Sequence, residues 1–357
     1  MSKINKMNER FKFLDISKAI LIILMVIGHS GAPFTSYIYL FHMAAFIFLS
    51  GYTFNGKYPL KIAMVKKIKS LYIPFIKYSL FFLICYNIFV WFGLFKDSVM
   101  VWSFDFYLKP MINILLLGGG IKGDGLLGAF WFLTMLIEIS MIYLILNFIV
   151  VKYLKNVRAM TIICLLIFII ANTILMMGYK LPRFLDNSLI MILIYHAGVI
   201  YRQYEDKIPN KFQYALISIF ILIFFNQFGS INVGLNVYVN PLFFIISSMS
   251  GVYLVLYISK TLIRFSECNF LNYIGKNTLT ILALHFFSFK LVSLIIIYVY
   301  SYPYEKISSF PVISIKGSMW WFLYSIVGVI LPLIIHQVYK YIFFNQKNKN
   351  PRLLRRN

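Results

Sequence analysis

The sequence predicts an all-α membrane protein: a bundle of about ten transmembrane helices with both termini in the cytoplasm. Hydrophobic residues make up 61% of the 357 residues and charged residues 13%, and the mean hydropathy is +0.81. This apolar fraction is more than a single soluble core can bury, so we expect lipid to cover the rest. Basic residues also cluster in short segments between apolar stretches of roughly 20 residues, the length that crosses a bilayer.

Ten apolar windows are long enough to span the hydrocarbon at a rise of about 1.5 Å per residue. We expect helices at 14–30, 37–55, 71–94, 128–151, 160–178, 185–202, 212–229, 238–259, 278–300 and 318–344. Pro33 and a second apolar window follow the first one closely, so we expect a retained helix and not a cleaved signal peptide. The chain is expected to form one membrane-embedded domain, 1–357, with a basic cytoplasmic tail at about 345–357.

The positions of lysine and arginine predict the orientation. With both termini inside, 24 basic residues fall in cytoplasmic segments and 7 in outer segments, while Lys18, Lys77 and Lys290 lie within windows. Cytoplasmic loops of membrane proteins carry such an excess. We therefore attribute the net charge of +23 to membrane topology, and nucleic-acid binding is not expected.

Several common site motifs are missing from the sequence. Cys85, Cys164 and Cys268 form no CxxC pair, so neither a disulfide framework nor a zinc site is expected. The glycine-rich stretch 118–125 lacks the Gly-Lys-Ser/Thr of a phosphate-binding loop, and we expect either a partly re-entrant segment or a plain linker. Neither Gly-x-Ser-x-Gly nor His-Glu-x-x-His occurs, so no hydrolase elbow and no catalytic metal are predicted.

The first window carries three polar residues on one face. His29 lies 11 residues after Lys18, a step that returns to within about 20° of the starting face of a helix, and Asp15 precedes Lys18 by three residues. Ionisable groups at membrane depth are functional candidates because each costs about 2.5 to 3.5 kcal/mol on insertion scales. A snorkelling lysine and an interfacial histidine would give the same pattern.

The second window contains another histidine, His42. A very short connection joins the two windows, so His29 and His42 are expected to face each other at the outer mouth. Two imidazoles at one mouth favour proton chemistry, although an interfacial histidine that caps a loop is an equally good interpretation of His42.

The fourth and ninth windows each contain one charged residue. Glu138 lies seven residues after Trp131 on the same helix face, and Lys290 lies about halfway along the ninth window. Each alone would be an uncompensated charge in hydrocarbon, so we predict a structural ion pair between them. His285 lies one to two turns before Lys290. The remaining membrane histidines are expected to pack helices: His196 and His336.

Four segments, taken together and in order, resemble the integral-membrane acyltransferase-three family, and in particular its fucose and polysaccharide O-acetylase branch. They are residues 13–18 through Gly28-His29, residues 41–43 with 48–52, residues 131–133, and residues 274–279 through His285. Three departures stand out. Lys18 stands where the family usually has arginine, Ala44 replaces a common proline, and Lys66 with Lys69 only approximates an Arg-x-x-Arg.

The resemblance implies transfer of an acyl group, most often acetyl from cytoplasmic acetyl-CoA, to a hydroxyl of an envelope polysaccharide or lipid-linked sugar at the bacterial cytoplasmic membrane. On this hypothesis His29 is the general base or acyl acceptor, with Lys18 and His42 beside it in the catalytic site. A basic cluster would attract the negatively charged donor: Lys66, Lys67 and Lys69. Five residues are expected to support the site or the substrate: Asp15, Trp131, Glu138, His285 and Lys290. The competing hypothesis is a non-enzymatic transporter or flippase for a polysaccharide or lipid-linked sugar, whose helices also carry isolated charges.

Overall fold

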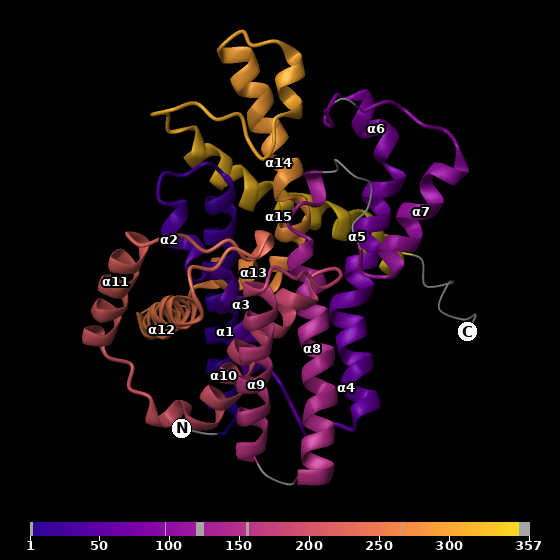
Figure 1. Ribbon diagram of the computed structural model, residues 1–357. Coiled ribbons are helices and arrows are strands. Elements are labelled where there is room, and N and C mark those ends of the chain that lie inside the picture. The colour runs from indigo at the N-terminus through magenta and orange to yellow at the C-terminus, as the bar shows by residue number, and fades with distance from the viewer. Residues whose placement is uncertain (1–2, 97, 119–124, 155–156, 266, 350–357) are drawn as a thin grey trace.

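The computed structural model describes residues 3–96, 98–118, 125–154, 157–265 and 267–349, and every extended regular element in these residues is a helix (Figure 1). The all-α prediction is confirmed. Most of the glycine-rich stretch for which a re-entrant segment or a linker was expected, residues 119–124, lies outside the described residues.

The first half of the chain contains α1 (Lys3–His29), α2 (Thr35–Tyr39), α3 (His42–Tyr52), α4 (Leu60–Lys67), η1 (Ile68–Tyr72), α5 (Ile73–Ile84), α6 (Tyr86–Trp91), α7 (Phe104–Leu115), η2 (Gly125–Leu127), α8 (Trp131–Ile149) and η3 (Val150–Leu154). The second half contains α9 (Val157–Met176), α10 (Leu185–Tyr204), η4 (Glu205–Lys207), α11 (Phe212–Asn226), η5 (Val233–Leu235), α12 (Pro241–Phe265), α13 (Asn269–Lys276), α14 (Thr278–Val299), η6 (Tyr304–Ser308) and α15 (Trp320–Lys349).

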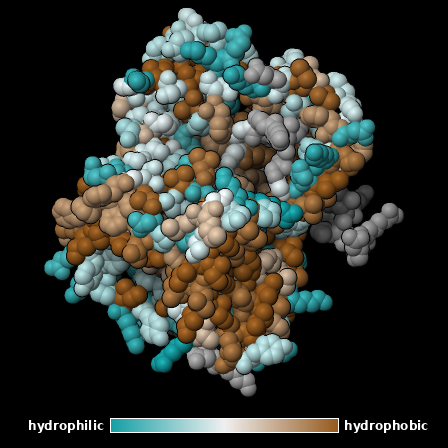
Figure 2. Space-filling model, in the orientation of Figure 1, coloured by the Kyte–Doolittle hydropathy of each residue, from teal (hydrophilic) through white to brown (hydrophobic). Residues whose placement is uncertain are grey.

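Five helical segments within the described residues are long and apolar enough to cross a membrane: Trp131–Leu154, Arg158–Met176, Pro241–Phe265, Thr278–Val299 and Trp320–Ile342. Hydrophobic side chains cover a broad area of the face seen in Figure 2. Together these observations identify a membrane protein.

The other predicted windows are shorter or divided. The window 37–55 is split between α2 and α3, and the window 71–94 between η1, α5 and α6. In Figure 1, α8 and α9 run down the page while α12 is strongly foreshortened, so the long helices do not share one direction. Ten spans and two cytoplasmic termini stay predictions.

Helices α3 and α10 touch at the level of their backbones. A Cβ atom at Gly51 would lie 1.9 Å from the carbonyl oxygen of Tyr195, and a Cβ atom at Gly198 would lie 2.1 Å from that of Phe48. Only glycine permits this approach, which is the small-residue packing typical of membrane helices. The contact fixes α3, and with it one wall of the site described below.

A π-helical turn, η1, joins α4 to α5. Pro74, the second residue of α5, has no amide hydrogen to donate to the carbonyl of Ser70, and its ring crowds that carbonyl. Widening the preceding turn to the π form relieves this conflict, and such turns are common at functional sites. It also changes the face that the residues around Ser70 present to the rest of the protein.

The segment that follows α14 folds back alongside that helix. The helix ends at Val299, yet the carbonyls of Ile307 and Ser309 accept hydrogen bonds from Lys290 Nζ at 3.0 and 2.8 Å. Since Lys290 lies nine residues before the helix end, the segment returns about 13 Å along the helix. Ile307 of this returning segment is fully buried.

Candidate active site

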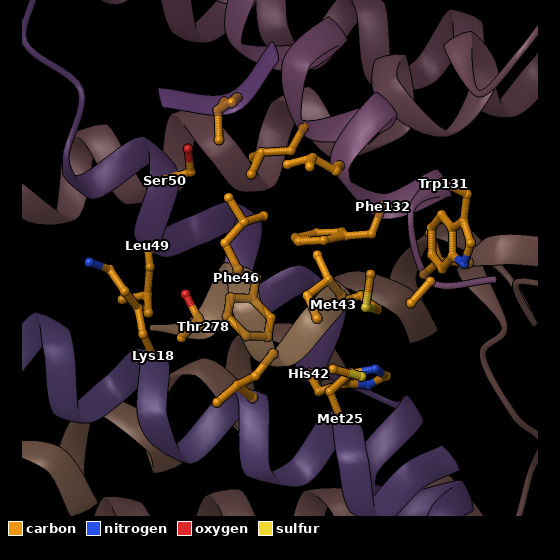
Figure 3. Close-up of a pocket in the computed structure, with 18 of the residues that line it drawn as sticks. Lys18, Met25, His42, Met43, Phe46, Leu49, Ser50, Trp131, Phe132 and Thr278 are labelled. Carbon is orange, nitrogen blue, oxygen red and sulfur yellow. The ribbon is translucent and has the colours of Figure 1, made fainter. Parts of the chain in front are cut away.

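A cavity of about 820 Å³ lies between α1, α3, α8, η1, α13 and the segment around η5. Figure 3 shows Lys18 at one end of this cavity and Trp131 at the other, with Met43, Phe46 and Phe132 between them. The cavity therefore has a basic end, an apolar middle and an end at Trp131, which we call the tryptophan end.

Helix α1 supplies the polar stripe that the sequence predicted. Asp15, Lys18 and His29 all line the cavity, because the 11-residue step keeps Lys18 and His29 on one helix face. Lys18 Nζ forms an ion pair with Asp15 Oδ1 at 3.2 Å, one turn away. The pair lies at the basic end, about 16 Å along the helix from His29.

A second lysine at the basic end was not singled out from the sequence. Helix α13 packs directly against α1, and a Cβ atom at Gly275 would lie 1.9 Å from the carbonyl oxygen of Asp15. The next residue, Lys276, therefore lines the cavity close to the ion pair of Asp15 and Lys18. The signal in the sequence was its place in the segment Gly275-Lys276-Asn277-Thr278, one of the four segments that carried the resemblance.

The predicted lysine cluster contributes one residue to the cavity. Lys67 lines it together with Ser70 and Leu71 of η1. Lys66 instead lies over the ring of Tyr58, with Nζ 3.3 Å from the ring centroid, and its hydrogen bond lowers the pKa of the exposed Tyr58 hydroxyl. Lys69 is exposed and is not among the lining residues.

His29 and His42 both line the cavity, and the Tyr39 ring contacts both imidazoles. The centroid of Tyr39 lies 6.4 Å from that of His29 and 5.1 Å from that of His42, and the Tyr39 hydroxyl donates to the carbonyl of Gly28 at 3.2 Å. Tyr39 was not among the residues singled out from the sequence, although it lies three residues before His42, about one helical turn away.

The partners of the two imidazoles define their tautomers. His42 Nδ1 lies 2.9 Å from the carbonyl oxygen of Ile38, which can only accept, so Nδ1 carries the proton. His29 Nδ1 lies 3.1 Å from the Met25 sulfur, also an acceptor, and the same assignment follows. In both rings Nε2 is left with a lone pair, which is the form that a general base needs.

His285 lies behind His29 and does not line the cavity. Its ring stacks on that of His29 with centroids 5.3 Å apart, and its Nδ1–H donates to the carbonyls of Ile281 and Leu282 at 3.1 and 3.0 Å. The side chain is fully buried. This position fits the supporting role predicted for His285.

The tryptophan end is lined by the segment around η5, residues 231–235, together with Trp131. Gly234 packs on the indole, since a Cβ atom there would lie 3.1 Å from Trp131 Cε2. The segment is held in place by Asn236, which donates to Asp186 Oδ2 at 2.8 Å.

Apolar side chains line the middle of the cavity and form what we call the apolar collar: Ile22, Met25, Met43, Phe46, Leu49, Phe132, Leu133 and Leu136. The rings of Phe46 and Phe132 are in contact, with centroids 5.6 Å apart. Figure 3 shows both rings pointing into the space between Lys18 and Trp131.

The predicted ion pair between Glu138 and Lys290 is wrong. Glu138 Oε2 accepts a hydrogen bond from Ser188 Oγ at 2.7 Å, which ties α8 to α10. Lys290 Nζ is bonded to the carbonyls of the returning segment after α14. Glu138 and Lys290 therefore form hydrogen bonds with different partners, and neither residue lines the cavity.

The model of a family described as acyltransferase domain matches residues 11–337, almost the whole chain. The chain belongs to this acyltransferase family. Separate comparisons with curated proteins and with solved structures gave no match. The resemblance of the four sequence segments to an acyltransferase family is thus confirmed, and the activity of the protein is acyl transfer in a membrane.

Proposed function

We propose that this acyltransferase moves an acetyl group from cytoplasmic acetyl-CoA to a hydroxyl of an envelope polysaccharide or lipid-linked sugar. The observation that carries the proposal is the cavity, because it joins a basic end to two imidazoles whose Nε2 atoms are free to accept a proton. No observation in the described structure favours a non-enzymatic transporter or flippase.

The basic end has the chemistry to hold the donor. Lys18, Lys67 and Lys276 converge there from three helices, and coenzyme A carries several phosphate charges. A lysine ammonium binds phosphate as a point charge, so three converging lysines replace the planar contacts that arginine would give. We assign Lys18 to donor binding, because its distance from His29 prevents both residues from touching the reacting carbonyl.

His29 is the proposed base. In a direct transfer, its Nε2 takes the proton of the acceptor hydroxyl while the oxygen attacks the thioester carbonyl. The carbon–sulfur bond then breaks, and the departing thiolate takes the proton from the imidazolium. In a two-step transfer, Nε2 itself attacks the thioester and releases the thiolate. The acceptor hydroxyl then attacks the acyl carbon and displaces the His29 imidazole, while its proton passes to Nε2 of His42 and from there to the thiolate.

His42 and Tyr39 complete the polar group around the reacting atoms. The Nε2 lone pair of His42 can accept a proton from the acceptor, while the Tyr39 ring contacts both imidazoles. The apolar collar on the donor side would surround the pantetheine arm and keep bulk water from the thioester.

The decisive experiment uses the full-length protein in vesicles that contain an envelope glycan extract and labelled acetyl-CoA. His29→Ala should lower transfer of label to the glycan by about 100-fold to 10,000-fold, the usual range for loss of a general base. The matched control is His336→Ala, the same change at a histidine of α15 that does not line the cavity, and it should retain transfer.

Equal activity of the wild type and the His29→Ala variant would remove His29 from the mechanism. If the wild type neither transfers nor hydrolyses the label, acetyl-CoA is not the donor, and other acyl donors then have to be compared.

A further inference from the structure

A second cavity, of about 620 Å³, lies beside the returning segment after α14. Its described lining comes from the end of the α6 region, from η2, from α14 and from the returning segment: Leu94, Phe95, Lys96, Gly125, Leu126, Lys290, Glu305, Lys306, Ser308, Ser309 and Phe310. It shares no lining residue with the first cavity.

The most unusual member of this lining is Lys290. Its side chain is only 4% exposed although it lies within an apolar helix. Two of its three N–H donors bond to the carbonyls of Ile307 and Ser309, which are neutral acceptors. As far as the described residues go, one donor and the positive charge of Lys290 are left for the cavity.

A buried ammonium in a membrane helix is stabilised by an opposite charge or by backbone carbonyls. Within the part of the chain that the structure describes, ion pairs join Lys18 to Asp15 and Lys260 to Glu205, and Lys290 takes part in neither. The carbonyls orient Lys290, but they do not neutralise it.

The rim of the second cavity adds to this positive charge. Lys96 and Lys306 are exposed there, and Glu305 is the acidic residue in the described lining. Lys306 Nζ lies 3.6 Å from the centroid of the Tyr302 ring, a contact that positions the ammonium without cancelling its charge. The hydroxyl of Ser309 is of the kind that binds oxyanions, whereas that of Ser308 donates to the carbonyl of Glu305 at 2.8 Å.

Aromatic rings connect this cavity to the catalytic histidine. Phe310 lines the second cavity and lies 4.7 Å from Phe286, centroid to centroid, and Phe286 lies 5.0 Å from His29. A molecule whose charged group is held at Lys290 is therefore two ring contacts from the proposed base. This proximity favours a substrate over an unrelated ion.

We infer that the second cavity binds a carboxylate or phosphate group of the acceptor, which makes the preferred acceptor an acidic glycan or a phosphate-bearing, lipid-linked sugar. The identification of the bound molecule as the acceptor rests on the proposed function. The anion site itself rests on Lys290, the rim charges and the cavity.

The test measures binding to the full-length protein in detergent, without an acyl donor. The probes are glucuronate and inorganic phosphate, with glucose as the neutral control, and the readout is the shift in thermal unfolding as each probe is titrated. We expect the wild type to be stabilised by both anions and not by glucose.

Variants at the rim test whether the site prefers negative charge, because removing a positive or a negative side chain should change anion binding in opposite directions. Lys96→Gln and Lys306→Gln should each weaken anion binding about two- to fivefold, while Glu305→Gln should tighten it by a similar factor. Lys316→Gln, a matched change at an exposed lysine outside the lining, should leave binding unchanged. Lys290→Met should weaken binding more than about tenfold. The rim variants keep the test valid if that variant does not fold.

Three results would overturn the inference: equal stabilisation by glucose, no response of anion binding to any rim variant, or weaker binding in Glu305→Gln. A comparison in lipid bilayers distinguishes a phosphate group of the acceptor from the phosphate of a lipid headgroup. Stabilisation that requires phosphatidylglycerol in nanodiscs, and that glucuronate cannot replace, would assign the site to a lipid headgroup and overturn the assignment to the acceptor.

Failure of the proposed function has a different signature. Anion binding could follow all the expected signs while labelled acetyl-CoA gives no transfer. In that case the anion site would stand and the donor or the reaction would be revised.

Discussion

The three imidazoles near the cavity are oriented by their own chain. His29, His42 and His285 each point Nδ1 back at the residue four positions earlier: Met25 sulfur, Ile38 carbonyl and Ile281 carbonyl, respectively. These acceptors hold the proton at Nδ1. The availability of Nε2 is therefore a local property of these residues, and no distant carboxylate is needed to create it.

Lys67 should contribute far more to donor binding than Lys66. Lys67→Gln should raise the KM for acetyl-CoA roughly tenfold with a smaller change in kcat, because it removes a charge that faces the donor in both the ground state and the transition state. Lys66→Gln is the matched control, since Lys66 is held over Tyr58, and its KM should stay within about twofold of the wild type. Similar effects of both variants on KM would contradict the assignment.

Glu138 should be coupled to Ser188 and not to Lys290. In a double-mutant cycle on thermal stability in detergent, Glu138→Gln with Ser188→Ala should show a coupling of about 0.5 to 3 kcal/mol, since the two share a hydrogen bond. Glu138→Gln with Lys290→Met should be additive within about 0.5 kcal/mol. Coupling in the second pair would restore the ion pair that the structure excludes.

For single residues, the sequence predicted several side chains that line the cavity, but it did not predict the contacts between residues that are distant in the sequence. The 11-residue step placed Lys18 and His29 on one face because helix geometry is local. The partners of Lys290 were mispredicted because they are backbone carbonyls in a returning segment. Every residue has such a carbonyl, so the sequence does not show which ones accept a hydrogen bond. Lys276 was missed because its position depends on the contact between Gly275 and Asp15, two residues far apart in the sequence.

The elements that build the site are mostly short. Helices α2, α3, α4 and α13 have between 5 and 11 residues, and they position Tyr39, His42, Lys67 and Lys276. Hydropathy windows detect long apolar segments, so the sequence located α8, α12, α14 and α15 well. It merged α2 with α3 in one window and left α4 and α13 outside every window. The breaks between these short helices depend on packing that a window average does not contain.

Gly51 should be the most sensitive glycine of the helix contact between α3 and α10. Gly51→Ala should destabilise the protein by about 1 to 3 kcal/mol or more, because its Cβ would overlap a backbone oxygen that cannot move without shifting α10. Gly56→Ala is the control, since its nearest neighbour is the end of the Phe54 side chain at 3.3 Å, and its unfolding temperature should hardly change. Thermal unfolding in detergent measures the stability of both variants. If Gly51→Ala melted at the same temperature as the wild type, α3 could move away from α10 without cost.

The whole cavity should be reachable from opposite sides of the membrane. After replacement of the three native cysteines, Ser70→Cys at the basic end should react with an impermeant thiol reagent only from the cytoplasmic side, and Asn232→Cys at the tryptophan end only from the outside. Acetyl-CoA should protect the first position and not the second. Labelling of both positions from one side would contradict a cavity that connects two compartments.

The apolar collar has an electrical consequence for the cell. A cavity that admits a donor at one end and an acceptor at the other is in danger of becoming a leak for protons and metal ions. The rings of Phe46 and Phe132, with the leucine, isoleucine and methionine side chains around them, offer a hydrated ion nothing in exchange for its water shell. A neutral acyl chain meets no such barrier. On the proposed function, the same side chains that would shield the thioester would also insulate the membrane, and a glycan could be modified without loss of the proton gradient.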